Sequence, residues 1–407
     1  MILRFYRDNA PWLATATLMS FGSSFGQTFF ISLFAGGIRA DFGLTDGQWG
    51  TLYTVATLGS ALLLLRLGRL ADTMDLTRLV VATVTVYATA LLTMAVAPTV
   101  LALGIGVLGL RLCGQGMMSH LALTATARWF RANRGRAVAI AVLGFPLGEA
   151  LLPPLAVALI GAVGWRFGWM IAATVLVGLI LPALLLLLAR GGRVPQGEGP
   201  VETAAGMQGR HWRQGEVLRH WSFWALIPGI LAPPFIGTVV FFHQVHVAEV
   251  RDWDLAVMAA GYPVYAGLSV LSSLLAGRVI DRLGPVRLLP VYLLPMAVAI
   301  SCLGIEGGES VWLLTLLGIG VSQGVVVTLL GALWPTLYGT AHIGGVKALA
   351  TAALVIATAV GPGITGVLID AGYPLPDQAP AMAGWALAAS LLFTLVTPRL
   401  KQATAPA

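Results

Sequence analysis

Charged residues are scarce in this chain of 407 amino acids, since Asp, Glu, Lys and Arg together make up only 10% of it. Soluble globular proteins are about 25% charged and about 45–50% apolar, whereas 57% of this chain is hydrophobic. A soluble fold of this length could not keep so much apolar surface away from water. The composition therefore excludes an ordinary soluble protein and favours one that lies in a lipid bilayer.

Cysteine and lysine are also rare. The two cysteines, Cys113 and Cys302, both fall in apolar stretches, so no disulfide framework is expected. The two lysines, Lys347 and Lys401, stand against 22 arginines, a bias typical of a GC-rich bacterial genome. A bacterial membrane protein of this kind would lie in the cytoplasmic (inner) membrane.

Sequence motifs of enzymes are missing as well. The chain contains neither a His-Glu-x-x-His pattern nor a phosphate-binding Gly-x-x-x-x-Gly-Lys pattern. Gly104, Gly106 and Gly109 form a Gly-x-Gly-x-x-Gly pattern, but no predicted strand precedes it, so it indicates close helix packing and not a dinucleotide site. We therefore expect no enzymatic activity and no cofactor.

Long apolar stretches recur along the whole chain. Each has about 20 or more residues, enough to cross a hydrocarbon core of about 30 Å. The first begins near Pro11 and exceeds the about 7–15 residues of a signal-peptide core, so we interpret it as a membrane span. The sequence predicts an all-α integral membrane protein with twelve transmembrane helices, at residues 11–37, 48–70, 78–97, 99–127, 136–162, 166–189, 222–247, 254–278, 285–304, 311–338, 345–369 and 380–398.

The positive charges gather on one side of these spans. Twelve spans put both termini on the same side, and the segments on that side carry 20 of the 24 Lys and Arg residues. The opposite side carries only Arg39, Arg166 and Arg251, and Arg111 lies inside a span. The positive-inside rule therefore predicts cytoplasmic termini. Because the charges are spread over several loops and form no single basic face, the bilayer is the expected partner and nucleic acid is not.

A polar segment near the midpoint, at about residues 191–220, mixes Gly, Pro, Glu and Arg. We interpret it as a cytoplasmic linker. It would join an amino-terminal six-helix bundle at residues 1–190 to a carboxy-terminal six-helix bundle at residues 221–407. The segment has too few apolar residues to form a domain of its own, and the chain is expected to act as a monomer.

The second half of the chain repeats the first at an offset of 208–209 residues. The matching pairs are Gly68 and Gly277, Asp72 and Asp281, Arg78 and Arg287, Gln115 and Gln323, and Pro153 and Pro362. Six spans separate the two copies, so they cross the membrane in the same orientation. Parallel repeats of this kind are expected of one large class of transporters.

The loop at residues 277–287, with the pattern Gly-x-x-x-Asp-Arg-x-Gly-x-x-Arg, resembles the signature loop of the major facilitator superfamily. The resemblance implies a secondary active transporter that moves a small solute by alternating access. It also implies two six-helix bundles related by a pseudo-two-fold axis normal to the membrane. Among the branches of this superfamily, the chain is similar to the CcoA-like branch, through its Phe-His-Gln-Val-His segment at residues 242–246, and to the monocarboxylate-type branch.

Both copies of this loop are expected to form a cytoplasmic gate, because Asp and Arg at helix ends can bridge to neighbouring helices in the closed state. The predicted gate residues are Gly68, Asp72, Arg78, Gly277, Asp281, Arg282 and Arg287. The first copy has Thr73 and Asp75 where a basic residue and a glycine are usual, which weakens this half of the gate or shifts its partners. The alternative is that these charges only cap helix ends.

Two charged residues, Arg111 and Glu149, lie near the middle of predicted spans, and charges at this depth are functional candidates. Adjacent antiparallel helices could bring them together. Desolvation and a nearby cation act on a carboxyl group in opposite directions, so Glu149 could titrate as water access changes. We expect Glu149 to bind a coupling proton and Arg111 to release it or to hold an anionic substrate. The alternative is a structural ion pair.

Other polar side chains in the spans are candidate substrate-binding residues: Gln27, Gln115, His243, Tyr262, Tyr265 and Gln323. Gln115 and Gln323 occupy equivalent positions in the repeat, as expected of residues that face a shared cavity. For each amide, hydrogen bonding between helices is the alternative. His243 could serve as an outer gate or a proton entry point, and the two tyrosines could line the cavity or pack in the core.

Three other functions remain open from the sequence. Cys113, Met117, Met118 and His120 lie within two helical turns and offer soft ligands that suit Cu(I), which would indicate copper import. The Met-x-x-x-Met and His-x-x-x-Met pairs of the copper importers are absent from residues 222–278, however, and we predict no metal site. The aromatic side chains would suit a multidrug proton antiporter. A non-transporting receptor is the third possibility, but it would have no need of buried charges.

Overall fold

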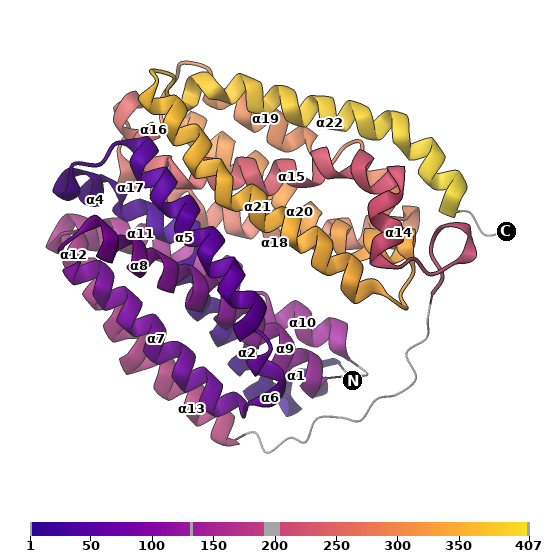
Figure 1. The fold of residues 1–407 in the computed structure, drawn as a ribbon, viewed down its shortest axis with the longest axis horizontal. Helices are drawn as coiled ribbons and strands as arrows, with labels where there is room; N and C mark the ends of the chain where they lie inside the picture. The colour runs from indigo at the N-terminus through magenta and orange to yellow at the C-terminus, as the bar shows by residue number, and fades with distance from the viewer. Residues whose placement is uncertain (1, 131–132, 191–203, 405–407) are drawn as a thin grey trace. The chain divides into compact units, whose positions relative to one another are not determined.

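The computed structural model describes residues 2–130, 133–190 and 204–404. The chain packs into two compact units, an amino-terminal unit at Met1–Pro200 and a carboxy-terminal unit at Val201–Ala407. All regular elements in these described ranges are helical, and Figure 1 shows the helices of each unit running side by side as a bundle. The predicted all-α class is confirmed. The domain boundaries predicted at residues 190 and 221 stay a prediction.

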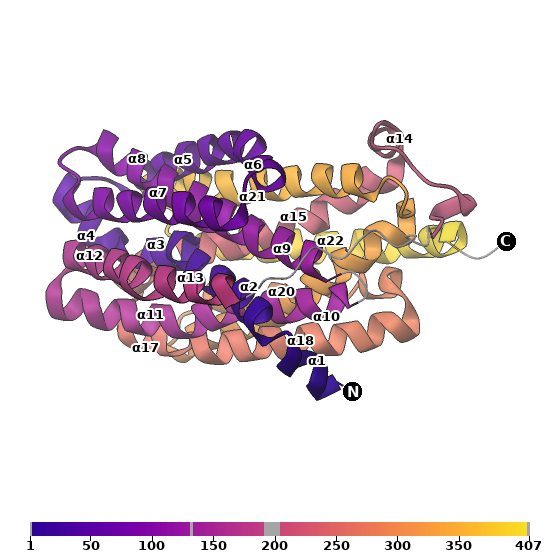
Figure 2. The same cartoon turned by 90° about the horizontal axis from the view of Figure 1, so that it is seen from below.

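The amino-terminal unit begins with a short helix, α1 (Ile2–Asp8), and continues through broken and bent helices (Figures 1 and 2). Its elements are α2 (Ala10–Gly22), η1 (Ser23–Gly26), α3 (Thr28–Ile31), η2 (Ser32–Phe34), α4 (Ala35–Phe42), α5 (Asp46–Leu67), α6 (Leu70–Thr73), α7 (Leu76–Val96), α8 (Val100–Leu110), η3 (Arg111–Met118), α9 (Ser119–Trp129), α10 (Arg134–Ala141), α11 (Gly144–Val163), α12 (Trp165–Val175), η4 (Leu176–Ile180) and α13 (Leu181–Arg190). Of these, η1 and η2 are 3₁₀-helices, and η3 and η4 are π-helices.

The carboxy-terminal unit has longer uninterrupted helices, and α18 packs along α20. Its elements are η5 (Met207–Gly209), α14 (Gln214–Arg219), α15 (Trp221–Phe242), α16 (Gln244–Arg251), α17 (Leu255–Ala260), α18 (Tyr262–Leu283), η6 (Pro285–Leu288), α19 (Leu294–Leu303), α20 (Ser310–Tyr338), α21 (Ile343–Asp370) and α22 (Leu375–Thr404). No π-helix occurs in the described part of this unit.

Side-chain caps explain where several helices begin. Thr45 and Gln48 form a capping box at the start of α5, in which each side chain bonds the backbone of the other residue. Asp75 accepts a hydrogen bond from the amide of Arg78 and starts α7. Such caps satisfy backbone N–H groups that have no partner within the helix, and each is worth about 1 kcal/mol.

Ten helices in the described residues are long and apolar enough to cross a membrane, and one bent pair makes an eleventh candidate. The bent pair, Ala10–Gly26 with Thr28–Phe42, turns by 44°. The prediction of one continuous helix at residues 11–37 is therefore wrong in its middle. Large apolar side chains remain exposed along the spans, such as Leu65 and Leu101, as expected of helices that face lipid.

The span predicted at residues 285–304 is only partly helical. Its α-helical part, α19, has ten residues, and 3₁₀ and turn backbone precede it. Pro290 and Pro295 account for the difference, because proline has no N–H to donate and so cannot lie within a regular α-helix without breaking a hydrogen bond. An apolar composition alone does not reveal this break.

One pair of equivalent positions in the sequence repeat places a buried tyrosine in each unit. Tyr53 and Tyr262 are 209 residues apart, and both are fully buried. The hydroxyl of Tyr53 lies 2.7 Å from Thr28 Oγ1, on the preceding helical segment. The hydroxyl of Tyr262 donates to Gln244 Oε1 at 2.8 Å, again on the preceding segment. The repeat therefore conserves the buried tyrosine, whereas its hydrogen-bond partners, Thr28 and Gln244, are not at equivalent positions.

Prolines within α15 are compensated by side chains from neighbouring helices. Pro233 cannot donate to the carbonyl of Gly229 four residues earlier, so this carbonyl needs another donor. The hydroxyl of Tyr292 donates to it at 2.8 Å. Near this break, Trp385 donates from Nε1 to the carbonyl of Pro228 at 3.0 Å. A buried backbone carbonyl without a partner would be costly in lipid, so these bonds stabilise the interrupted helix.

Part of the segment predicted as a cytoplasmic linker packs against the carboxy-terminal unit. We call residues 204–220 the strap; residues 191–203 of the predicted linker lie outside the described residues. The strap pairs with the loop after α20: the amide of Thr340 donates to the carbonyl of Ala204 at 2.9 Å, and that of Trp212 donates to the carbonyl of Tyr338 at 3.0 Å. Trp212 is buried against His220 and Tyr338.

The end of the strap carries a titratable group. His220 Nδ1 lies 2.7 Å from Ser222 Oγ, which in turn lies 2.9 Å from the hydroxyl of Tyr338. Burial of the imidazole, with a further contribution from the cation of Arg210, lowers the pKa of His220 below its ordinary value. The docked strap therefore favours neutral His220.

Acidification should release the strap. Because the pKa of His220 is lowered on docking, the stabilisation it gives is complete above about pH 6.5 and is lost as the pH falls through the lowered value. The measurement is the hydrogen-exchange protection factor of the Trp212 amide between pH 7 and pH 5. Protection should fall with pH in the native protein and much less in His220→Asn. Equal pH dependence in both proteins would show that His220 is not the sensor.

Substitution of Gly26 should destabilise the amino-terminal unit. A Cβ atom on Gly26 would clash with the backbone carbonyl of Leu110 and lie 2.9 Å from the Cα of Gly114. Overpacking of this kind costs about 1–3 kcal/mol, and each kcal/mol shifts the Tm of a unit of this size by about 2–4 °C. Gly26→Ala should therefore lower Tm in detergent by about 5 °C. Gly161→Ala, at a position with open space around it, is the control and should not lower Tm.

Candidate functional site

The guanidinium of Arg111 is the centre of the candidate site. Arg111 begins the π-helix η3 and is only 2% exposed. Its Nη1 donates to the backbone carbonyl of Gly26 at 3.3 Å and to Thr28 Oγ1 at 3.4 Å. Its Cζ lies 5.1 Å from the centre of the Tyr53 ring. Within the described residues, this buried cation has neutral partners and no ion pair.

The break in the first span supplies the carbonyl that Arg111 binds. Gln27 has extended backbone, with φ −84° and ψ 155°, between η1 and α3. The helix therefore ends at Gly26, and its last carbonyls are not used within the helix. The carboxyl end of a helix carries a partial negative charge, which favours a nearby cation. This geometry explains how a guanidinium without a carboxylate is tolerated in the bundle.

The backbones of the broken span and of η3 touch at this point. Gly26 and Gly114 face each other, so a side chain at either position would clash with the other. The hydroxyl of Tyr87, from α7, donates to the carbonyl of Ser23 at 3.3 Å beside the same crossing. Small residues permit such close helix crossings in membranes, and π-helical segments are frequent at functional sites. The crossing therefore fixes Arg111 against the end of η1.

Glu149 lies on another helix that contacts η1. It is partly buried on α11, and its neighbour Gly148 lies so close to Ser24 that a Cβ atom there would clash with the serine hydroxyl. The described hydrogen bonds of Arg111 go to the carbonyl of Gly26 and the hydroxyl of Thr28. A direct pairing of Arg111 with Glu149 stays a prediction.

Among the candidate residues Gln27, Gln115 and Gln323, the side chain of Gln323 contacts a neighbouring helix. Its Nε2 lies 3.5 Å from the carbonyl of Pro233 on α15, and Gly237 leaves the space that this side chain occupies. This contact favours the alternative of hydrogen bonding between helices for Gln323. Gln115, on η3, is partly buried, and Gln27 is the extended residue before α3. Their contact with a substrate stays a prediction.

The aromatic and histidine candidates of the carboxy-terminal unit are buried. Tyr262 is held by Gln244, and Tyr265 packs edge-on against Phe241 at 5.4 Å between ring centres. His243 is 2% exposed, and its Nε2 lies 3.2 Å from the carbonyl of Pro362. These positions favour core packing of the two tyrosines. A gating or substrate-binding role for these residues stays a prediction.

The sulfur-rich cluster of residues 113–120 is divided between different environments. Cys113, Met117 and Met118 are buried, whereas His120 is exposed and its Nε2 lies 3.2 Å from the carbonyl of Gly68. A search of the residues that the structure describes finds no group of three His, Cys, Asp or Glu side chains able to hold a metal. The copper-import alternative gains no support from this geometry.

The loop between α5 and α7 is tied to the end of α9. Arg128 Nη2 contacts Asp72 Oδ1 at 2.5 Å, and Arg128 Nη1 donates to the carbonyl of Ala71 at 2.6 Å. Asp75, which departs from the usual glycine of the signature loop, is the residue that caps α7. Its equivalent, Gly284, instead takes a positive φ of 79°. The two loops therefore start their next elements by different means.

The remaining predicted gate residues are not fixed in the same way. Asp281, Arg282 and Arg287 are exposed at the end of α18 and in η6, and Arg78 is exposed in the first turn of α7. Gly68 and Gly277 follow or lie within the ends of the corresponding helices, α5 and α18. A cytoplasmic gate formed by these residues stays a prediction.

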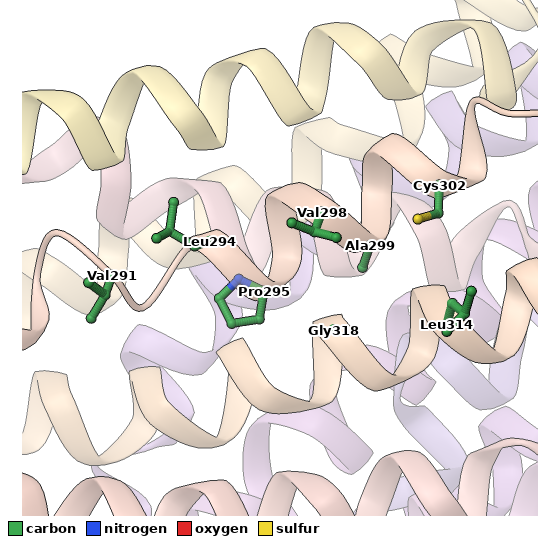
Figure 3. Close-up of a pocket in the computed structure, with 8 residues that line it drawn as sticks. All are labelled: Val291, Leu294, Pro295, Val298, Ala299, Cys302, Leu314 and Gly318. Carbon is green, nitrogen blue, oxygen red and sulfur yellow. The ribbon is translucent and has the colours of Figure 1, made fainter.

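The groove with the largest volume among the pockets described here, about 560 Å³, lies between α19 and α20 (Figure 3). Its lining is formed by Val291, Leu294, Pro295, Val298, Ala299, Cys302, Leu314 and Gly318. Val298 is 64% exposed, so the groove opens on the outside of the bundle. It offers no charged group to orient a solute, unlike an ordinary ligand site with a few convergent polar groups. It does not extend the candidate site.

Sequence reasoning missed two residues of the site, Thr28 and Tyr53. Both are uncharged and lie in apolar stretches, so neither stands out by composition. The repeat offset of 209 relates Tyr53 to Tyr262 and could have indicated it. The helix break at Gln27, which exposes the carbonyl of Gly26, has no comparable signal.

Comparison with known proteins places the fold. Residues 16–362 match the family model described as the Major Facilitator Superfamily. Among solved structures, the chain is similar to a bacterial homologue of the human lysosomal transporter Spinster. In its inward-facing and unoccupied conformation the TM-score is 0.69 at 16% identity, over 97% of each chain. In the occupied conformation the TM-score is 0.67 at 16% identity, over 98% of this chain and 95% of the other. No curated protein sequence matches the chain.

Replacement of Arg111 by an apolar residue should not destabilise the fold. A buried charge without a counter-ion carries a desolvation penalty of several kcal/mol, whereas Arg111→Met removes the charge and keeps the side-chain length. We expect a Tm in detergent equal to or above that of the native protein, even though the Gly26 carbonyl loses its donor. A fall in Tm of about 5 °C or more would contradict this account. Arg128→Met, which removes a largely exposed pair with Asp72, is the matched control and should change Tm little.

Proposed function

This chain belongs to the major facilitator superfamily, and we propose that it carries a small organic anion across the bacterial cytoplasmic membrane together with protons. Membership makes it a multi-pass membrane transporter and not an enzyme. What we propose beyond this membership is that the solute is an organic anion and that the coupling ion is the proton. It rests on two residues of the amino-terminal unit, Arg111 and Glu149.

The observation that carries the proposal is the electrostatic state of Arg111. A guanidinium offers five N–H donors and stays charged under all physiological conditions. Here Nη1 makes the described hydrogen bonds, Nε is buried without a partner, and the surrounding groups are neutral. A carboxylate accepts two parallel hydrogen bonds from such a group. An anionic solute would therefore satisfy both the charge and the unused donor.

Glu149 is the proposed proton carrier. Through the contact of Gly148 with Ser24, α11 rests on the same four-residue segment, η1, whose last carbonyl binds Arg111. A shift of η1 would therefore alter the surroundings of Glu149 and Arg111 together. Protonation of Glu149 removes a negative charge that would repel an incoming anion. Because both groups depend on η1, proton binding at Glu149 would be coupled to anion binding at Arg111.

Glu149→Gln should separate exchange from net transport. The glutamine mimics the protonated carboxyl group, so exchange of labelled for unlabelled anion should continue in proteoliposomes. Uptake driven by an imposed pH gradient should fall at least tenfold, because the variant cannot release a proton. The assay uses a panel of labelled monocarboxylates and dicarboxylates, with neutral amides of the same shape as competitors that should not inhibit.

The matched control is Glu306→Gln, which removes an exposed carboxylate from the loop before α20. It should retain gradient-driven uptake. The proposal fails if Glu149→Gln, present at native levels and with native Tm, still accumulates the solute in response to a pH gradient. Failure of Arg111→Lys to weaken anion binding would remove the anionic part of the proposal and leave the proton part intact.

A further inference from the structure

A polar pocket lies wholly within the carboxy-terminal unit, between α15, the end of α21 and the start of α22. Its volume is about 420 Å³, within the range of small-molecule sites. It differs from the groove of Figure 3 in having a carboxylate, an amide and three aromatic rings on its walls. The residues that matter are Phe235, Thr365, Tyr373, Asp377, Gln378 and Trp385.

The amino-terminal unit contains the equivalent pocket, and it is apolar. This pocket of about 280 Å³ lies between the broken first span, α11, α12, η4 and α13. The repeat offset of 209 relates its Leu159 to Leu368 and its Gly168 to Asp377. Each of the two pockets therefore has its own apolar wall, whereas only the carboxy-terminal pocket has a carboxylate in its lining. Comparison of the two pockets shows which polar side chains are particular to the carboxy-terminal one, among them those of Asp377 and Gln378.

Asp377 has no described partner for its charge. It lies in the first turn of α22, is exposed, and makes no ion pair with any residue that the structure describes. The start of a helix stabilises a carboxylate by only about 0.3–1 kcal/mol. The carboxylate is therefore available to a cationic ligand.

Gln378 makes the floor of the pocket electronegative. It is 7% exposed, and its Nε2 donates to the carbonyls of Thr365 at 3.2 Å and Tyr373 at 2.8 Å. These two acceptors fix the orientation of the amide, because its oxygen could not replace the nitrogen there. Oε1 is left without a donor among the described residues. An unpaired buried acceptor favours positive charge nearby.

Aromatic rings flank the same space. Phe235 and Trp385 pack edge to face with 5.3 Å between their ring centres, and Trp385 Nε1 donates to the carbonyl of Pro228, which holds the indole in place. Tyr373, at the mouth, is 59% exposed. Faces of aromatic rings attract organic ammonium groups. The equivalent apolar pocket has its own rings but no carboxylate beside them.

We propose that this pocket binds an amphipathic organic cation, an alkylammonium group on an apolar chain. The ammonium group lies beside the Asp377 carboxylate and the rings of Tyr373 and Trp385, and the chain lies along Phe235 and Leu368. The site is separate from Arg111, which belongs to the other unit and favours anions. Its occupancy does not depend on the transported solute.

The experiment is calorimetric titration of the full-length protein in dodecylmaltoside with decyltrimethylammonium, below its micelle-forming concentration and with empty micelles as the blank. The native protein should show saturable binding. Asp377→Asn keeps the shape of the side chain and should raise the Kd at least tenfold, whereas Asp377→Glu should retain most of the affinity. Trp385→Phe keeps a ring and should weaken binding less than Trp385→Leu.

Two controls distinguish the site from general partitioning. Asp252→Asn removes an exposed carboxylate elsewhere in the same unit, at a left-handed position that asparagine tolerates, and should leave the Kd unchanged. Decanol and decyl sulfate, the neutral and anionic counterparts, should show no dependence on Asp377. The proposal is overturned if decyltrimethylammonium binds Asp377→Asn as well as it binds the native protein, or if the native protein shows no saturable binding.

Discussion

The contact between the end of η1 and the start of η3 is the interaction on which the amino-terminal unit depends. Gly26 and Gly114 let two backbones meet, and this contact sets the carbonyl of Gly26 against Arg111. Ser24, in the same short segment, meets Gly148 of α11. One 3₁₀ turn thus connects the buried cation to the helix of Glu149. Any motion of this turn acts on both charged groups.

The two units share one plan and differ in where their polar groups lie. Tyr53 and Tyr262 are buried at equivalent positions, and both units have a pocket at the same repeat position. Among the described residues, an arginine is buried in the amino-terminal unit alone, and of the two equivalent pockets the carboxy-terminal one has the carboxylate. Duplication supplied a common bundle, and each copy then took on a different polar chemistry.

The sequence predicted the class and the repeat well, because both depend on long apolar stretches and on spacing. It did not predict the break at Gln27 or the short α19, because both depend on backbone geometry that apolar composition does not encode. Arg111 was identified by its depth, but its hydrogen bond to the carbonyl of Gly26 was not. Asp75 looked like a loss from the signature loop and is instead the cap of α7. A tertiary contact set the partner of Arg111, whereas prolines shortened α19 and a local side-chain cap gave Asp75 its role.

The π-helix η3 records a difference in the history of the two halves. A π turn holds one more residue than an α turn, and α20, its counterpart, has no π segment. The repeat offset is 209 between Arg78 and Arg287 but 208 between Gln115 and Gln323, so the first half has one additional residue between these positions. The count fits the insertion of one amino acid into an ancestral helix after duplication. Because Arg111 begins this segment, the insertion that distinguishes the halves coincides with the residue that carries the buried charge.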